Sequence, residues 1–450
     1  MAGSGALRRA RIAGSLVFGL NGALAAMWVA QIPVISARTG VDHAALGGLL
    51  LAAGLSAFVS MQIFGPLADR LGTRGLCVFA VCALALAIVG PTLVTSPRSL
   101  LIALIAFGFF NGALDVSMNS QAVVIERLYR RPIMSSFHAY FSLGGLVGSA
   151  VVAAALFAGA QPWMTACAVA AISVVAVWVV AGALIPDRPG DVVDAIPDAR
   201  TADRTTADPA DTDSSPTNTD GRAGVAGRVP IALRVSVMAV LAFSLMLAEG
   251  SAYDWSGLHM VERYGVTDVV GAVAFAVFSL TMLVGRLRAD ALVARRGAAW
   301  VVRAGALIAV VGMSVVICAP TPWLSVIGWA LFGLGVAAGV PQLFSAAGNL
   351  SAASSGRYIS IVVGAGYLGM LAGPASIGFV ARHTTLGVAL WLAAAAAAVA
   401  VLGAGVIGAT PTPRDHRRRP DGGVRPGGGA GPGGGVRPDG GTRPGDVTVS

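Results

Sequence analysis

The chain has 450 residues, of which 56% are hydrophobic and only 12% are charged, and its mean hydropathy is +0.76. Soluble domains carry about 25% charged residues, so this composition argues against a cytosolic enzyme. The net charge of +9 comes entirely from arginine, because the sequence contains no lysine. A basic balance can indicate nucleic-acid binding, so the positions of the arginines must be examined before that reading is accepted.

Long apolar runs recur along the whole chain. A helix needs about 20 apolar residues to cross the hydrocarbon core of a bilayer, and the runs lack the alternation of barrel strands. We therefore predict an all-α polytopic membrane protein with twelve transmembrane helices. The expected spans in the first half are 12–33, 44–66, 76–96, 99–124, 133–157 and 164–185. Those in the second half are 232–255, 268–287, 299–319, 323–346, 358–380 and 385–408.

Two polar segments divide the chain into parts. We expect an N-terminal six-helix bundle at 1–185, a linker at 186–230, a C-terminal six-helix bundle at 231–409 and a tail at 410–450. The linker is rich in Asp, Thr, Pro and Ala, and the tail in Gly, Pro and Arg. Neither can bury enough apolar surface to fold alone, so both are predicted to be disordered and cytoplasmic.

The arginines indicate the orientation in the membrane. With twelve spans, 13 arginines of the N-terminus and short loops fall on one side, and four fall on the other. Arg286 and Arg288, at the end of the eighth span, are counted with the loop that joins it to the ninth. Positive charge marks the cytoplasmic side, so both termini are predicted to be cytoplasmic and no nucleic-acid partner is expected. Arginine in place of lysine, with abundant alanine and glycine, indicates a GC-rich bacterial genome and hence the bacterial inner membrane.

The two halves contain related features. The loop from Gly65 to Gly75 follows the second span, and a loop containing Asp290 follows the eighth, 221 positions after Asp69. Phe107-Gly108 and Phe332-Gly333 are separated by 225 positions, as are Gly144 and Gly369. A two-fold repeat of six-helix units is typical of secondary transporters.

The first of these loops resembles the signature of the major facilitator superfamily, G-x-x-x-D-R-x-G-x-[RK], at Gly65, Asp69, Arg70, Gly72 and Arg74. The resemblance implies that the charged residues, and more weakly Asp290, help to set the equilibrium between inward and outward states. The alternative is topogenic charge plus a helix cap, which explains the arginines but not the Gly-Asp-Gly spacing. Stretches 111–121, 136–145 and 249–256 resemble the bacterial sugar-permease-like branch related to fucose permeases.

A few polar residues lie inside the predicted spans. Asp115 is flanked by Asn111 and Asn119 on one face of the fourth span. These groups could bind a hydroxylated substrate, or Asp115 could carry a proton, or the aspartate could be structural glue between helices. Glu249, placed in the outer part of the seventh span, could couple protons or bind substrate, or it could be solvated near the outer interface.

Asn21 in the first span and Gln342 in the tenth complete a pattern. Together with Asp115 and Glu249 they fall on spans one, four, seven and ten, which line the central cavity in the family that the chain resembles. Trp28 and Tyr367 are candidate aromatic cavity residues beside them. A lone histidine at a helix end, His138, is more often structural than a proton relay.

These observations predict a transporter and no enzyme. Without lysine there is no GxxxxGK[ST] phosphate loop, and HExxH and GxSxG are absent, so we expect no catalytic residue, cofactor or metal. We predict a monomeric secondary transporter that moves a small sugar-like or other polar solute through the bilayer by alternating access, with proton coupling through Asp115 or Glu249 as one option. Efflux of small lipophilic compounds and a transporter-derived membrane sensor are the alternatives.

Overall fold

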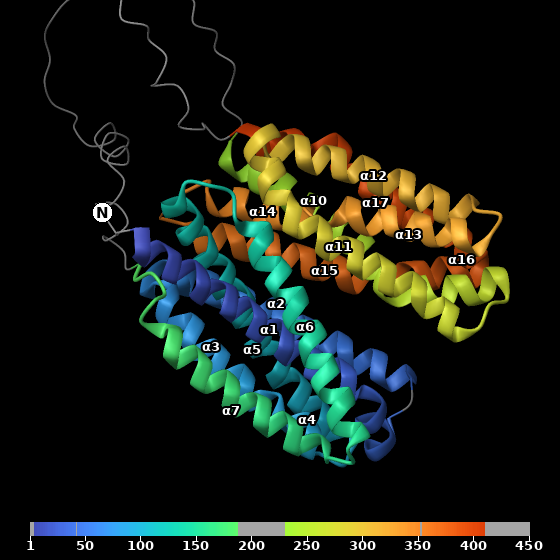
Figure 1. The fold of residues 1–450 in the computed structure, drawn as a ribbon, viewed down its shortest axis with the longest axis horizontal. Coiled ribbons are helices and arrows are strands. Elements are labelled where there is room, and N and C mark those ends of the chain that lie inside the picture. Colours follow the sequence, from blue (N-terminus) through green and yellow to red (C-terminus); the bar gives the residue numbers. More distant parts are fainter. Residues whose placement is uncertain (1–3, 42, 188–229, 352, 410–450) are drawn as a thin grey trace, which may run out of the picture. The chain divides into compact units, whose positions relative to one another are not determined.

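The computed structural model describes residues 4–41, 43–187, 230–351 and 353–409. The tail predicted at 410–450, and nearly all of the linker predicted at 186–230, lie outside the described residues. Within the described ranges the regular elements are all helices (Figure 1).

Seven helices form the first half of the chain. They are α1 (Ser4–Thr39), α2 (His43–Leu71), α3 (Thr73–Ala87), α4 (Val89–Leu93), α5 (Pro97–Tyr129), α6 (Met134–Phe157) and α7 (Pro162–Ala181). The third predicted span is divided between α3 and α4, and the other five predicted spans each correspond to one helix. The start of α5 is fixed locally, because the Ser96 side chain accepts a hydrogen bond from the Ser99 backbone N–H and Pro97 occupies the first turn.

The second half begins with α10 (Ile231–Tyr264), α11 (Asp268–Arg296) and α12 (Ala298–Cys318). It continues with α13 (Pro322–Val336), α14 (Gly339–Gly348), α15 (Ser355–His383), α16 (Leu386–Ala389), α17 (Trp391–Gly403) and the 3-10 turn η1 (Ala404–Ala409). The tenth predicted span is thus broken between α13 and α14, two residues before Pro341, whose missing N–H weakens a helix at this point. The twelfth is divided among α16, α17 and η1.

Eleven helical segments of the described residues are long and apolar enough to cross a membrane. Helix α11, which corresponds to the predicted eighth span, is 29 residues long but is not one of them. It carries Arg286, Arg288 and Asp290 toward its C-terminal end, whereas the sequence of residues 268–285 contains a single charged residue, Asp268. The eleven segments establish a polytopic helical protein.

The two halves repeat the same packing. Helix α1 packs on α6 and α2 on α5 in the first half, as α10 packs on α15 and α11 on α13 in the second. A side chain at Gly144 would collide with the backbone of Gly19, and one at Gly369 would collide with the backbone of Phe243. The glycines that repeat at a spacing of 225 residues therefore permit equivalent close approaches of helix backbones.

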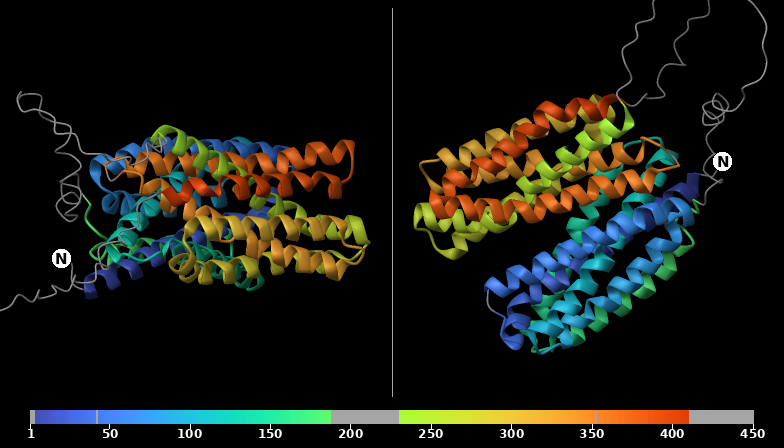
Figure 2. Two further views of the ribbon diagram at one scale, coloured as in Figure 1. Left: turned by 90° about the horizontal axis from the view of Figure 1, so that it is seen from above. Right: turned by 180° about the vertical axis from the view of Figure 1, so that it is seen from behind.

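Helices α1, α7, α10 and α17 place the ends of both halves on one side of the helical bundle (Figure 1). Helix α1 begins there, α7 ends there, α10 begins there, and α17 leads there through η1. We call this side the terminal end. The two groups of helices lie close together at the terminal end and diverge away from it in the view from behind (Figure 2).

The chain after α7 is fastened to the start of α3. The Thr73 backbone N–H and the Thr73 hydroxyl both donate to the Asp187 carboxylate, each at 2.8 Å, and the Gln121 side chain donates to the Ile185 carbonyl at 3.4 Å. Burial raises the pKa of Asp187 above its ordinary value, although the hydrogen bonds from Thr73 oppose that rise. These contacts fasten the chain at the start of the predicted linker to α3 and α5.

Candidate functional site

The two halves are joined at the terminal end by a carboxylate from the loop motif. Asp69, near the end of α2, accepts hydrogen bonds from the backbone N–H groups of Gly356 at 2.7 Å and Arg357 at 2.9 Å. These are the first N–H groups of α15, which have no partner within their own helix. Asp69 therefore binds the N-terminus of a helix that belongs to the other half, where a negative charge is favoured.

Asp290 makes the corresponding contact from the second half to the first. It lies in α11 and accepts from the backbone N–H groups of Ser135 at 2.9 Å and Ser136 at 2.7 Å, at the start of α6. The Ser136 hydroxyl also donates to it. Since α2 corresponds to α11 and α15 to α6, the two aspartates form a symmetric pair of contacts between the halves. The resemblance assigned Asp290 a weaker role than Asp69, but the two carboxylates bind in the same way.

The other loop-motif residues have different surroundings. Gly65 lies where α2 approaches α15 most closely, since a side chain there would collide with Ser360. Gly72 has a φ of 81°, which favours glycine, at the turn between α2 and α3. Arg70 is exposed and Arg74 is half-buried; within the described part of the chain, no ion pair to either side chain is found.

A second pair of charged residues at the terminal end was not anticipated from the sequence. Glu126 near the end of α5 accepts from the backbone N–H groups of Ile133 and Met134, each at 2.8 Å, and from the hydroxyl of Ser345 in the other half. Arg127 donates to Asn349 at 2.7 Å and to the Gly348 carbonyl at the end of α14. In the sequence, Glu126 and Arg127 form an adjacent acid and base at the end of an apolar span. The count of arginines assigned Arg127 to a loop.

The polar face predicted on the fourth span lies deeper, in the middle of α5. Asp115 is 6% exposed, and Asn119, which is fully buried, donates to its backbone carbonyl at 2.8 Å and lies 3.4 Å from its carboxylate. The Asn111 amide donates to the Tyr367 hydroxyl of α15 at 3.4 Å. His138 of α6 lies 3.1 Å from the side-chain oxygen of Asn119. The cluster therefore joins three helices and both halves.

The remaining predicted cavity residues divide into two groups. Gln342 of α14 donates to the Ser135 hydroxyl at 3.1 Å and so belongs to the junction between the halves. Asn21 of α1 is 1% exposed and lies 3.5 Å from the Met118 sulfur, with no partner for its side-chain oxygen. Trp28 is buried, with 5% of its surface exposed. Asn21 therefore contacts a residue of α5 in the first half, and Trp28 belongs to an apolar cluster that contains residues of both halves.

Glu249 forms the one ion pair found in the described part of the chain. Its carboxylate lies 3.1 Å from Arg286 of α11, and both side chains are 6% exposed. The sequence interpretation placed Glu249 in the outer part of its span and counted Arg286 in a loop, and both placements were wrong. Helix α10 continues to Tyr264, so Glu249 lies near its middle, and α11 continues to Arg296, so Arg286 is buried within it.

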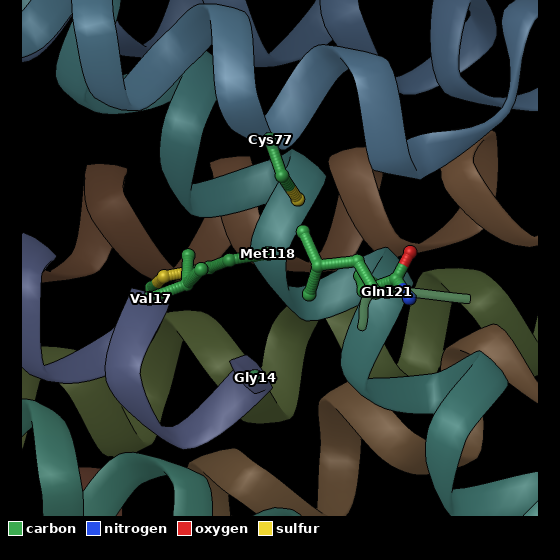
Figure 3. Close-up of a pocket in the computed structure, with 6 residues that line it drawn as sticks. Gly14, Val17, Cys77, Met118 and Gln121 are labelled. Carbon is green, nitrogen blue, oxygen red and sulfur yellow. The ribbon is translucent and has the colours of Figure 1, made fainter. Parts of the chain in front are cut away.

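A small crevice is present inside the first half (Figure 3). It is lined by Gly14 and Val17 from α1, Cys77 from α3, Met118 and Gln121 from α5, and Leu184. Its walls are mostly apolar, and all the residues that line it belong to the first half. In the described residues, no group of three or more His, Cys, Asp or Glu side chains could hold a metal ion.

The fold and the junction define a class: a polytopic helical protein of two repeated halves, joined by polar contacts at one end and in the middle. The model of the Major Facilitator Superfamily matches residues 13–312. The chain belongs to this superfamily and is a multi-pass membrane transporter.

The chain is also similar to individual transporters in sequence or in fold. The chain is 32% identical over 376 residues to an uncharacterised MFS-type transporter of Yersinia pestis, covering 83% of this chain and 89% of that protein. Its fold is similar to the crystal structure of the MFS transporter FucP in the outward conformation, with a TM-score of 0.69, 16% identity and coverage of 89% and 98%. The proton:xylose symporter XylE gives a TM-score of 0.66, 14% identity and coverage of 89% and 95%.

Proposed function

We propose that this transporter is a secondary active carrier of a small, hydroxylated solute, with twelve transmembrane helices, both termini in the cytoplasm and a location in the bacterial inner membrane. The observation that carries the proposal is the cluster of Asn111, Asp115, Asn119 and Tyr367 between the halves. Amide, carboxylate and phenol groups offer both donors and acceptors, which is the chemistry that a polyhydroxylated solute needs. The transport activities named for XylE and FucP are properties of those proteins. The structural similarity of this chain to them supports its fold.

The positions of the contacts between the halves support alternating access. The interhalf hydrogen bonds of the described residues lie between the terminal end and the middle of the helices, from Asp69 and Asp290 up to Asn111 and Arg286. A state closed at the terminal end exchanges with one closed at the opposite end when the two halves rock about the central cluster. If the terminal end is cytoplasmic, the present arrangement is outward-facing.

Proton coupling fits Asp115 better than Glu249. The charge of Glu249 is offset by Arg286 at 3.1 Å. Asp115 has only the neutral Asn119 within hydrogen-bonding distance of its carboxylate, among the described residues. A proton gained or lost at Asp115 therefore changes a charge that no neighbouring cation offsets, and such a change couples strongly to solute binding in the membrane interior.

The test is uptake into proteoliposomes that contain the purified protein. Sugars, sugar acids, polyols and lipophilic drugs would be offered with an imposed proton gradient, and each would also be tested for thermal stabilisation of the protein in detergent, since a ligand of the folded state raises its stability. We expect uptake of a hydroxylated solute that accelerates with an inward proton gradient. Stabilisation and transport by lipophilic compounds alone would contradict the proposal and favour efflux.

A further inference from the structure

Arg286 is a buried cation with unused hydrogen-bonding capacity. Its side chain donates to Glu249 at 3.1 Å through one Nη atom and to the Ser142 hydroxyl at 2.7 Å through the other. The buried Nε–H has no partner. A guanidinium presents five N–H donors in a planar fork that matches a carboxylate, so the resident contacts leave part of this fork free.

The position of Arg286 links it to the proposed solute site. Glu249 and Arg286 belong to the second half, whereas Ser142 belongs to α6 of the first half. One turn earlier on α6, His138 contacts Asn119, which in turn contacts Asp115. The guanidinium is therefore connected through neighbouring side chains to the hydroxyl-binding cluster, at the level where the two halves meet.

Stability alone gives a poor account of this pair. Removing two charges from water is costly, and a buried ion pair is often no more stabilising than apolar residues of the same volume. A pair kept only to hold α10 against α11 would not require an additional hydrogen bond to the other half or a buried N–H without a partner. An incoming anion would satisfy that free donor.

We propose that Arg286 is the binding site for the carboxylate of the transported solute, which is a hydroxylated organic acid such as an aldonate or uronate. The proposal rests on the transport function proposed above. The solute carboxylate competes with the Glu249 carboxylate for the guanidinium and also engages the free Nε–H. The hydroxyl groups of the solute bind the Asn111, Asp115 and Tyr367 cluster.

Titratable groups on the neighbouring helices lie near Glu249 and Arg286. Tyr253 lies one turn from Glu249 on α10, and its phenol is close enough to both Glu249 and Arg286 for their charges to act on it. His138 of α6 is close enough to Arg286 to be affected by its charge. Asp115 on α5 is reached through Asn119. Of the titratable groups named here, Glu249 is the one in direct contact with the guanidinium, so it is the resident anion with which a solute carboxylate must compete.

The experiment compares matched pairs of solutes on the purified full-length protein. The probes are D-gluconate with D-glucose, and D-galacturonate with D-galactose, measured by equilibrium binding and by thermal stabilisation between pH 5 and pH 8. For the wild type we expect an acid to bind more tightly than its neutral partner. For Arg286→Gln we expect the affinity for the acid to fall by at least about 100-fold, because truncating one partner of a buried charge pair is costly.

Further variants separate charge from folding. Arg286→Lys keeps the charge but loses the planar fork, and we expect a loss of about tenfold. In Glu249→Gln the guanidinium has no resident anion, so the acid should bind at least as tightly as it binds to the wild type. The double variant Arg286→Gln/Glu249→Gln leaves no unpaired buried charge and serves as the folded variant that should not bind the acid. Ser142→Ala removes a neutral partner only and should change the affinity less than threefold.

Three results would overturn the inference. If the neutral sugars bind and are transported while the acids do not, the carboxylate site is wrong and the transport function stands. If the acids bind equally to the wild type and to the double variant, Arg286 is not their site. If neither acids nor neutral sugars bind or are transported, both proposals fall.

Discussion

At the scale of single residues, Asp115 and Glu249 are two buried carboxylates with different surroundings. Glu249 is paired with a guanidinium, whereas Asp115 is contacted by an amide four residues along the same helix. Burial of an uncompensated charge is expensive in the membrane interior, so the two acids are suited to different tasks. Asp115 is the candidate for coupling to protons, and Glu249 is the resident partner of Arg286.

Replacing Asp115 tests the first of these roles. In Asp115→Asn we expect initial uptake driven by a proton gradient to fall by at least about tenfold, equivalent to ~1.4 kcal/mol, and its pH dependence to disappear, because the amide cannot exchange a proton. The measurement is solute uptake into proteoliposomes from pH 5 to pH 8. Asp254→Asn is the control, since Asp254 is an exposed acid of α10. Unchanged uptake with an unchanged pH profile in Asp115→Asn would exclude Asp115 as the proton carrier.

At the scale of elements, each half contributes a carboxylate to the N-terminus of a helix in the other half. Asp69 binds the start of α15 and Asp290 binds the start of α6. The hydrogen bonds and the favourable helix dipole act only while the terminal end is closed. We propose that such contacts stabilise one conformational state, so that their loss shifts the equilibrium toward the other state rather than unfolding the protein.

We therefore expect Asp69→Ala and Asp290→Ala to open the terminal end. Loss of one cap costs about 1 kcal/mol, which corresponds to roughly a fivefold change in the ratio of the two states. The measurement is the rate of alkylation of a cysteine introduced at Ser360, which is 1% exposed between α2 and α15, in a background without the four native cysteines. Glu262→Ala, an exposed acid near the opposite end of α10, is the control. Equal rates in the wild type and both variants would show that these carboxylates do not stabilise the closed end.

At the scale of the whole molecule, two repeated halves meet along α2 with α15 and α6 with α11. These pairs are related by the repeat, so a rocking motion can exchange one set of contacts for a related set at the opposite end. The terminal end carries charged contacts that involve Asp69, Glu126, Arg127 and Asp290. Its chain ends are flanked by the arginine-rich segments that predict the cytoplasmic side.

The predicted orientation can be tested with reporter fusions. Green fluorescent protein fused after residue 450 should fluoresce in bacterial cells, and alkaline phosphatase at the same place should be inactive, because the positive-inside rule places this end in the cytoplasm. Alkaline phosphatase inserted between α10 and α11, at the opposite end, should be active and serves as the control. The reverse pattern would invert the assignment of the present state as outward-facing.

The sequence by itself determined the class of protein, because apolar runs of about 20 residues leave few alternatives to membrane-spanning helices. It also predicted the loop motif at Asp69 and the polar face at Asp115, since these depend on spacing along one helix or loop. The ends of the helices were harder to predict from the sequence. The charges of α11 resembled those of a loop, so Arg286 was assigned to the wrong environment. Only the tertiary structure decided which helix each charge contacts, because the pairing of Asp69 with α15, Asp290 with α6 and Arg286 with Glu249 depends on how helices distant in sequence pack together.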